Sequence, residues 1–322
     1  MAKHLFILLS LAFLSTQSVF AQDTMNMTQL IEMANVGDVD SQKKLVYKYY
    51  DMKSYYESKH WCDILIANPK ADNSIKGEIC DVLGVFACNG YGMEQSYDEA
   101  LKYWSNGADY ESYKCAVRIA TFYDNTWEYN DYGKAWYWYV KAADMGDKKS
   151  QRFVASQYEN PNSIIKYKTS IDAEGKKKMT MNVPNYPVGD KNLSKALYYY
   201  EKFLSHGQSI IKNGMWYISR DVRTHYIVAK IYYEGGQDVK QDYEKAFEHL
   251  EAIVFSDDYE ERDFFIFDDE ELSDEEEGDA FWLISTCYRF GRGVTKNSMA
   301  AMKYTKKAAE KGNEKAKALL RE

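Results

Sequence analysis

Residues 83–109 read LGVFACNGYGMEQSYDEALKYWSNGAD, and residues 284–312 read ISTCYRFGRGVTKNSMAAMKYTKKAAEKG. Each stretch has a first helix of small and apolar residues, then a Gly-x-Gly turn at 90–92 or 291–293, and then a second helix. Residues 131–146, DYGKAWYWYVKAADMG, repeat the second half. Self-similarity of this length is typical of a repeat array, in which each unit packs mainly on its neighbours. The sequence therefore predicts an all-α chain built from helical hairpins.

About six hairpins can be placed along the chain. The first helices carry an apolar residue and a tyrosine or alanine four positions apart, on one helix face: Leu45/Tyr49, Leu83/Ala87, Ile119/Tyr123, Val154/Tyr158, Val228/Tyr232 and Ile284/Tyr288. The second helices open on a small residue: Ala100, Ala135, Ala196, Ala246 and Ala301. The separation between the first two of these alanines gives the repeat length, and the larger separations that follow indicate insertions.

Two insertions differ in character from the repeats. Residues 160–190 contain two short alternating runs around Asp172–Gly175, which predicts a β-hairpin leaning on the helices. Residues 256–279 form an acidic insertion, with 14 Asp and Glu against one Arg between 257 and 279. We expect this segment to be a solvated loop. Its end, Ser273-x-x-Glu276, matches a capping box at the start of a helix.

The N-terminus has the pattern of a signal peptide. Lys3 and His4 precede an apolar run of about ten residues, and Val19 and Ala21 supply the small residues that precede a cleavage site. We expect cleavage after Ala21, which leaves residues 22–322 as an exported chain, periplasmic or secreted. No segment is long and apolar enough to predict stable membrane insertion.

Five cysteines in an exported chain allow a disulfide. Cys62 and Cys80 lie symmetrically about the loop between two antiparallel helices, so they are the pair that could join. The alternative is that both are small buried apolar residues.

The repeats resemble the Sel1-like family of tetratricopeptide-like helical repeats. Lys134-Ala135-x-x-Trp138-Tyr139-x-Lys141-Ala142-Ala143-x-x-Gly146 follows the pattern of that family, and residues 291–312 repeat it from the Gly-x-Gly-Val turn onwards. Weaker copies follow Ala196 and Ala246. The resemblance covers roughly residues 34–317 and implies a right-handed α/α solenoid with a concave face.

Motifs for catalysis, metal or cofactor binding are absent from the sequence. There is no His-Glu-x-x-His, no Cys-x-x-Cys, no Gly-x-Ser-x-Gly and no phosphate-binding loop. The acidic insertion lacks the spacing of a calcium loop. No basic stripe indicates nucleic acid. We therefore expect no enzyme activity and no cofactor.

Three aromatic residues exceed what the repeat pattern requires: Trp136, Tyr137 and Tyr198. Such residues are enriched at protein interfaces, although they could instead pack against the inserted hairpin. The sequence thus predicts a scaffold that binds a protein or peptide partner through the solenoid surface. Two alternatives stay open: binding of a carbohydrate or cell-envelope polymer through exposed aromatics, and a role as the regulatory subunit of an enzyme.

Overall fold

The computed structural model describes residues 26–161, 163, 166–171, 177–182, 184–205, 208–212, 215–219, 221–254, 266–267 and 272–321. The chain divides between Asn130 and Asp131 into two compact units, called unit 1 and unit 2. The predicted signal peptide and most of the acidic insertion lie outside the described residues.

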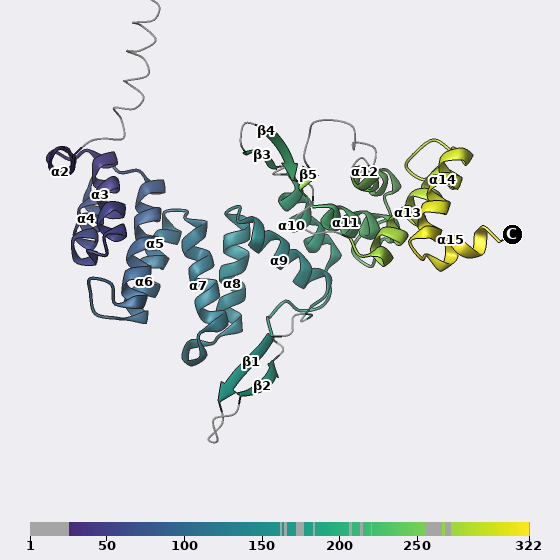
Figure 1. Ribbon diagram of the computed structural model, residues 1–322. Helices are drawn as coiled ribbons and strands as arrows, with labels where there is room; N and C mark the ends of the chain where they lie inside the picture. Colours follow the sequence, from purple (N-terminus) through teal and green to yellow (C-terminus); the bar gives the residue numbers. More distant parts are fainter. Residues whose placement is uncertain are drawn as a thin grey trace, which may run out of the picture. The chain divides into compact units, whose positions relative to one another are not determined.

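Unit 1 is built from helices. They are α2 (Met27–Asn35), α3 (Val39–Asp51), α4 (Tyr55–Ala67), α5 (Asn73–Asn89), α6 (Tyr97–Asp109) and α7 (Tyr113–Asn125), with a 3-10 turn η2 (Trp127–Tyr129). Helices α3 and α4 pack together as one hairpin, and α5 and α6 as the next (Figure 1). The predicted hairpin arrangement is therefore present in unit 1.

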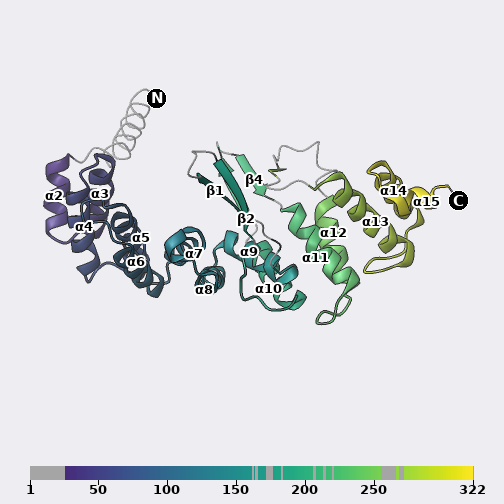
Figure 2. The same cartoon turned by 90° about the horizontal axis from the view of Figure 1, so that it is seen from below.

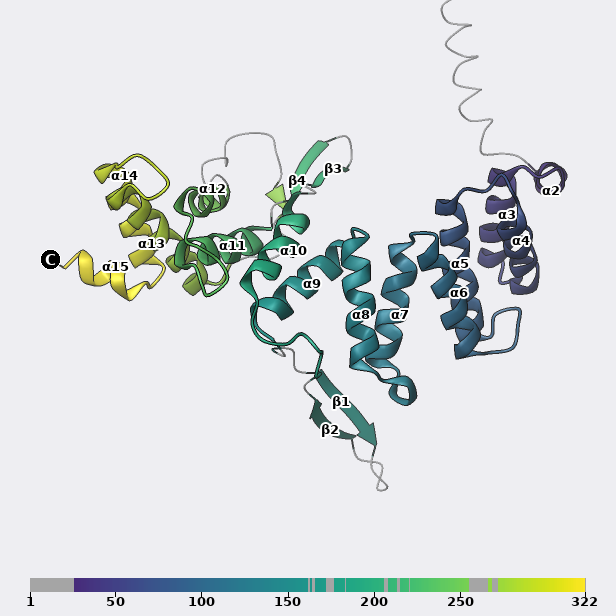
Figure 3. The same cartoon turned by 180° about the vertical axis from the view of Figure 1, so that it is seen from behind.

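Unit 2 continues the helical-hairpin pattern. Its helices are α8 (Tyr132–Asp144), α9 (Lys148–Glu159), α10 (Leu193–Ser205), α11 (Val222–Glu234), α12 (Tyr243–Val254), α13 (Asp274–Phe290), α14 (Ser298–Glu310) and α15 (Glu314–Leu319). Helix α9 packs on α10, α11 on α12 and α13 on α14, while α15 covers α14 (Figures 2 and 3).

Short strands lie between the helices of unit 2. Strands β1 (Lys166–Ile171) and β2 (Lys177–Asn182) lie in the first insertion and pair antiparallel, with Lys166 opposite Asn182. Strands β3 (Gln208–Lys212) and β4 (Met215–Ser219) also pair antiparallel, and β4 pairs in parallel with β5 (Ile266–Phe267). Strands β3, β4 and β5 were not predicted from the sequence.

The second helices start at a fixed point because a capping residue stands four positions before each alanine. The side-chain oxygen of that residue accepts a hydrogen bond of 2.9 to 3.2 Å from the backbone N–H three positions later. Such a bond satisfies an N–H group that the helix itself leaves without an acceptor. The capping residues are Ser96, Asp131, Asn192, Asp242 and Asn297. The predicted capping box of Ser273 and Glu276 is confirmed at the start of α13.

One pair of stacked rings recurs in the core of each hairpin of unit 2. The tyrosine of the first helix lies against the ring three residues after the alanine of the second helix. Tyr158 stacks on Tyr199 with centroids 6.1 Å apart, and Tyr288 stacks on Tyr304 at 5.9 Å. The alanine beside each pair is buried, and Ala196 has no exposed surface. A methyl group at this position lets the helices approach closely enough for the rings to meet.

The two Gly-x-Gly turns pack against the hairpin that precedes them. Gly92 and Gly293 have φ values of 65° and 69°, in the left-handed region. A Cβ atom at Gly92 would lie 2.5 Å from the backbone oxygen of Tyr55, the first residue of α4. A Cβ atom at Gly293 would lie 2.9 Å from Cα of Glu244, in the first turn of α12. Glycine is therefore required at both positions by backbone contact as well as by conformation.

None of the helices in the described ranges is both long and apolar enough to cross a membrane.

Substitution of Gly293 should disturb the packing of the α13/α14 hairpin against the start of α12. Gly293→Ala combines a left-handed φ, which costs an L-residue roughly 1–2 kcal/mol, with overpacking that costs about 1–3 kcal/mol more. Gly312→Ala is the matched control, since Gly312 also has a positive φ of 96° but open space around its Cβ position. Thermal unfolding should show a clearly lower Tm for Gly293→Ala than for Gly312→Ala. Equal losses would mean that the backbone contact contributes nothing.

Candidate functional site

Unit 2 contains a groove of about 1840 Å³. We call it the unit 2 groove. It is lined by residues of α9, of the second half of α10, of α11 along its whole length and of 272–279 at the start of α13. First helices of successive hairpins thus form its walls. Sites for small molecules are commonly about 300–1000 Å³, so this groove has room for a segment of a macromolecule.

Ion pairs fix the walls of the groove to one another. Arg152 of α9 donates to the Asp221 carboxylate at 2.9 Å, and only 6% of the Asp221 side chain is exposed. Asp221 also caps α11 by accepting from the N–H of Thr224 at 2.8 Å. Arg223 of α11 pairs with Glu276 of α13 at 3.2 Å. Charged contacts therefore link three successive first helices, α9, α11 and α13, across the groove.

Tyrosine hydroxyls donate to carboxylates in the same region. Tyr200 donates to Glu159 at 2.7 Å, and Tyr226 donates to Asp279 at 3.4 Å. Burial, followed by the neighbouring negative charge, raises the pKa of Tyr200 and of Tyr226. Both phenols therefore stay protonated and act as hydrogen-bond donors, which gives them a positioning role and no role in acid–base chemistry at neutral pH.

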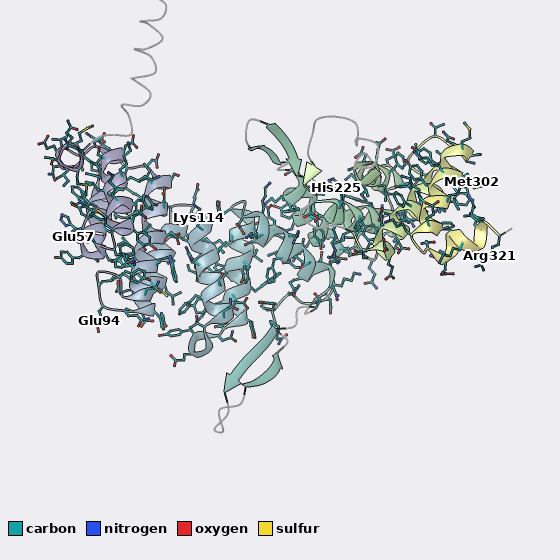
Figure 4. The ribbon with its side chains drawn as sticks, viewed as in Figure 1. Glu57, Glu94, Lys114, His225, Met302 and Arg321 are labelled. Atoms are coloured by element: carbon teal, nitrogen blue, oxygen red, sulfur yellow. The ribbon has the colours of Figure 1, made fainter. Side chains whose placement is uncertain are left out.

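A histidine pair lies beside the groove in the hairpin of α11 and α12. The Nδ1 atoms of His225 and His249 are 2.9 Å apart, so one ring donates a hydrogen bond to the other. His225 lines the groove near the start of α11 (Figure 4). His249 occupies the position that Tyr199 and Tyr304 hold in the flanking hairpins, and it stacks on Tyr232 with centroids 6.3 Å apart. Burial lowers the pKa of His249.

The three aromatic candidates from the sequence have different environments. Tyr137 and Tyr198 are 60% and 51% exposed, and neither lines the groove. Trp136 is buried, at 8% exposure, and its ring meets those of Tyr158 at 5.4 Å and Tyr186 at 6.1 Å. Tyr186 follows the inserted strands in the chain. Trp136 thus packs against the insertion, and its proposed role as an exposed partner contact is corrected to a role in the core.

Tyr137 and Tyr198 hold equivalent positions, two residues after the alanines of α8 and α10. Lysines accompany the rings beside them: Lys141 lies 4.7 Å from the centroid of Trp138, and Lys202 lies 4.5 Å from that of Tyr198. A lysine over an aromatic face is favourable through the ring quadrupole. The two second helices therefore share the positions of an exposed tyrosine and of a lysine, but the lysine lies over Trp138 in α8 and over the exposed Tyr198 itself in α10.

The two cysteines that the sequence suggests as a pair, Cys62 and Cys80, are not joined in the structure. All five cysteines, each within the described residues, are free thiols, and Cys62 and Cys80 are both buried. Burial raises the pKa of both thiols, to about 11 for Cys80. The structure thus presents the alternative in which both pack as small apolar residues.

Metal ligands were not predicted from the sequence, and over the described ranges no three His, Cys, Asp or Glu side chains converge as a metal site. The unit 2 groove was not predicted either. Its lining residues come from segments up to about 130 positions apart, from Lys148 to Asp279, and no local motif marks them.

Replacement of Trp136 by alanine should destabilise unit 2. Loss of a buried tryptophan typically costs about 3–5 kcal/mol, whereas Tyr137→Ala, at the neighbouring exposed position, should stay within about 0.5 kcal/mol. Chemical denaturation of both variants measures the difference. A Trp136→Ala variant as stable as Tyr137→Ala would place the Trp136 ring outside the core.

The histidine pair predicts a dependence of stability on pH. The pKa of His249 is lower in the folded state than the value of about 6.5 expected in the unfolded chain. The unfolded state therefore binds the proton first as the pH falls, and stability is lost below about pH 6.5, while above it both states are neutral.

A variant with the tyrosine of the neighbouring hairpins tests this contribution. His249→Tyr should show a smaller loss of Tm than the unchanged protein between about pH 7.5 and pH 5.5, since it removes the titrating group. His60→Tyr, at an exposed histidine of unit 1, should keep the full loss. An unchanged loss in His249→Tyr would assign the pH dependence to other groups.

The segments that match a known protein family coincide with the helical hairpins described above. The Sel1 repeat family matches five segments of the chain: residues 82–109, 128–147, 188–208, 223–252 and 282–313. Comparison with curated protein sequences gives no match.

The solved structures similar to the chain include the following two. One is a protective antigen present in uropathogenic Escherichia coli strains that displays an SLR fold, with 18% identity, a TM-score of 0.46 and coverage of 91% of this chain and 50% of that one. The other is a Sel1 repeat protein from Oxalobacter formigenes, with 18% identity, a TM-score of 0.42 and coverage of 85% and 87%. The chain spans about half the length of the Escherichia coli protein. With five matched segments between residues 82 and 313, the chain belongs to the Sel1 repeat family.

Proposed function

We propose that this protein is an exported scaffold that binds a segment of a protein partner in the unit 2 groove and catalyses no reaction. The observation that carries the proposal is the size and lining of the groove. Four helices contribute to it, and its volume of about 1840 Å³ exceeds what a small molecule fills. Export rests on the signal-peptide pattern of residues 1–21, and a right-handed superhelix on the resemblance of the repeats.

The chemistry of the lining supports peptide binding. Half-buried apolar surface from Phe153, Phe203 and Ile227 lies among charged side chains of both signs. Such a mixture offers both apolar contact and directed polar contact to an extended chain. The phenols of Tyr200 and Tyr226 donate to carboxylates within the lining and so help to hold its shape.

A carbohydrate or envelope polymer is the second candidate ligand. Tyr137 and Tyr198, exposed at equivalent positions of α8 and α10, favour it because sugar rings stack on exposed aromatic faces. Retardation on polysaccharide gels that disappears in the Tyr137→Ala/Tyr198→Ala double variant, with no protein partner recovered, would support this candidate over the groove.

Filling the groove should abolish partner capture. Ser156 of α9 lines the groove and is half-buried, and its hydroxyl bonds only the backbone oxygen of Phe153. Ser156→Arg should therefore occupy space without removing a core contact. Thr121→Arg, at an exposed position of α7, is the control. The immobilised protein is incubated with the exported fraction of the native organism, and bound proteins are identified by mass spectrometry.

We expect a partner that binds the unchanged protein and Thr121→Arg, and that is reduced about tenfold or more on Ser156→Arg, equivalent to about 1.4 kcal/mol. A partner retained by Ser156→Arg but lost from the Tyr137→Ala/Tyr198→Ala variant would move the interaction away from the groove.

A further inference from the structure

The charged residues of the unit 2 groove are separated by sign along the array. The wall formed by α9 and the residues before α10 contributes Lys148, Lys149, Arg152 and Lys191 against Glu159, a net charge of +3. The wall formed by the start of α13 contributes Glu275, Glu276 and Asp279 with no basic residue, a net charge of −3. Between them, α11 with its capping residue Asp221 contributes two acidic and two basic residues and is neutral.

The order of these walls is fixed by contacts within unit 2. The Arg152–Asp221 pair joins α9 to the start of α11, and the Arg223–Glu276 pair joins α11 to α13. The hydrogen bond from Tyr226 to Asp279 makes a second link between α11 and α13. The basic wall, the neutral wall and the acidic wall therefore follow one another in space as they do in the chain.

The rim of each outer wall carries exposed charge. Lys149 and Lys191 are exposed on the basic side, and Glu275 is exposed on the acidic side. The ion pairs Arg152–Asp221 and Arg223–Glu276 link the walls, whereas Lys149, Lys191 and Glu275 are exposed and can meet a ligand. Apolar surface from Phe153, Phe203 and Ile227 lies among the charged residues.

We propose that the groove binds an extended peptide whose charges are arranged in blocks, with carboxylates at one end, apolar residues in the middle and amines at the other end. The acidic block lies over the α9 wall and the basic block over the start of α13. This inference rests on the proposed function, since it names the chemistry of the segment that the groove accepts.

Electrostatic complementarity selects between partners of equal composition. A peptide with the same residues in mixed order would bring like charges together at both walls, which opposes binding and slows association. A purely acidic or purely basic peptide would satisfy one wall and be repelled by the other. Binding in the groove should therefore depend on the order of charges along the peptide more than on its net charge.

Synthetic peptides test the inference directly. The probe is a fluorescein-labelled peptide with four glutamates, a central segment of leucine, glycine and serine, and four lysines. Its matched comparison has the same composition with alternating charges. Binding to the full chain is measured by fluorescence anisotropy at low salt, because exposed charges are screened beyond about 10 Å at 0.1 M salt.

Two charge reversals probe the two ends. The Lys149→Glu/Lys191→Glu variant should bind the block peptide about tenfold more weakly, and an all-glutamate peptide should lose affinity to the same extent. The Glu275→Lys variant should bind both the block peptide and an all-lysine peptide more weakly. Lys114→Glu and Glu57→Lys are the matched controls, at exposed positions of unit 1 that Figure 4 marks. Circular dichroism and Tm establish that each variant folds, and Lys149→Gln/Lys191→Gln gives a milder version of the first change.

Tighter binding of the block peptide than of the alternating peptide, with losses in both groove variants and none in the controls, supports the inference. Equal affinity for the two peptides, equal effects of the unit 1 controls, or no binding of the block peptide would overturn it. The proposed function is judged separately, because it stands or falls with the loss of the native partner on Ser156→Arg.

Discussion

The stack of one tyrosine ring on one aromatic ring, beside a buried alanine, is the contact between first and second helix that recurs in each hairpin of unit 2. The ring centroids are 5.9 to 6.3 Å apart in the three hairpins, with the planes within 13° of parallel. Aromatic pairs contribute about 0.5–1.5 kcal/mol beyond the area they bury. This contact joins α9 and α10 directly, whereas the segment between them adds Tyr186, a buried ring that packs on Trp136 and Phe153.

The repeat positions were predictable from the sequence because the contact is local and recurs. The apolar and tyrosine pairs of the first helices and the alanines of the second helices mark the helices that the structure contains. The capping residues were present in the sequence but went unused, although Ser96 and Asp242 stand four positions before their alanines. Strands β3 and β4 were also missed, despite the Asn213-Gly214 dipeptide between two β-branched and aromatic runs, which is a strong hairpin signal.

The candidate site was less predictable than the fold. The excess of aromatics after Ala135 pointed to exposed rings, which holds for Tyr137 and fails for Trp136, since one residue along a helix turns a side chain by about 100° and decides its burial. The groove depends on which first helices become neighbours and on where the insertions leave them open. That information lies in tertiary packing, so nothing in the sequence indicates that the charges on α9 and α13 line the same groove.

Folding and recognition draw on different residues in this array. An exposed ion pair contributes only about 0–1 kcal/mol to stability, so charges such as Lys149 and Glu275 can vary with the partner at little risk to the fold. The stacked rings are more constrained, because a replacement there has to keep a flat ring between the two helices, as His249 does opposite Tyr232. His249 lies at the boundary between these two groups: it occupies a stacking position, yet its ring titrates and meets His225 on the groove wall. A repeat can therefore gain a titrating group with little loss of stability where a ring of the core also lies next to the surface that meets a ligand.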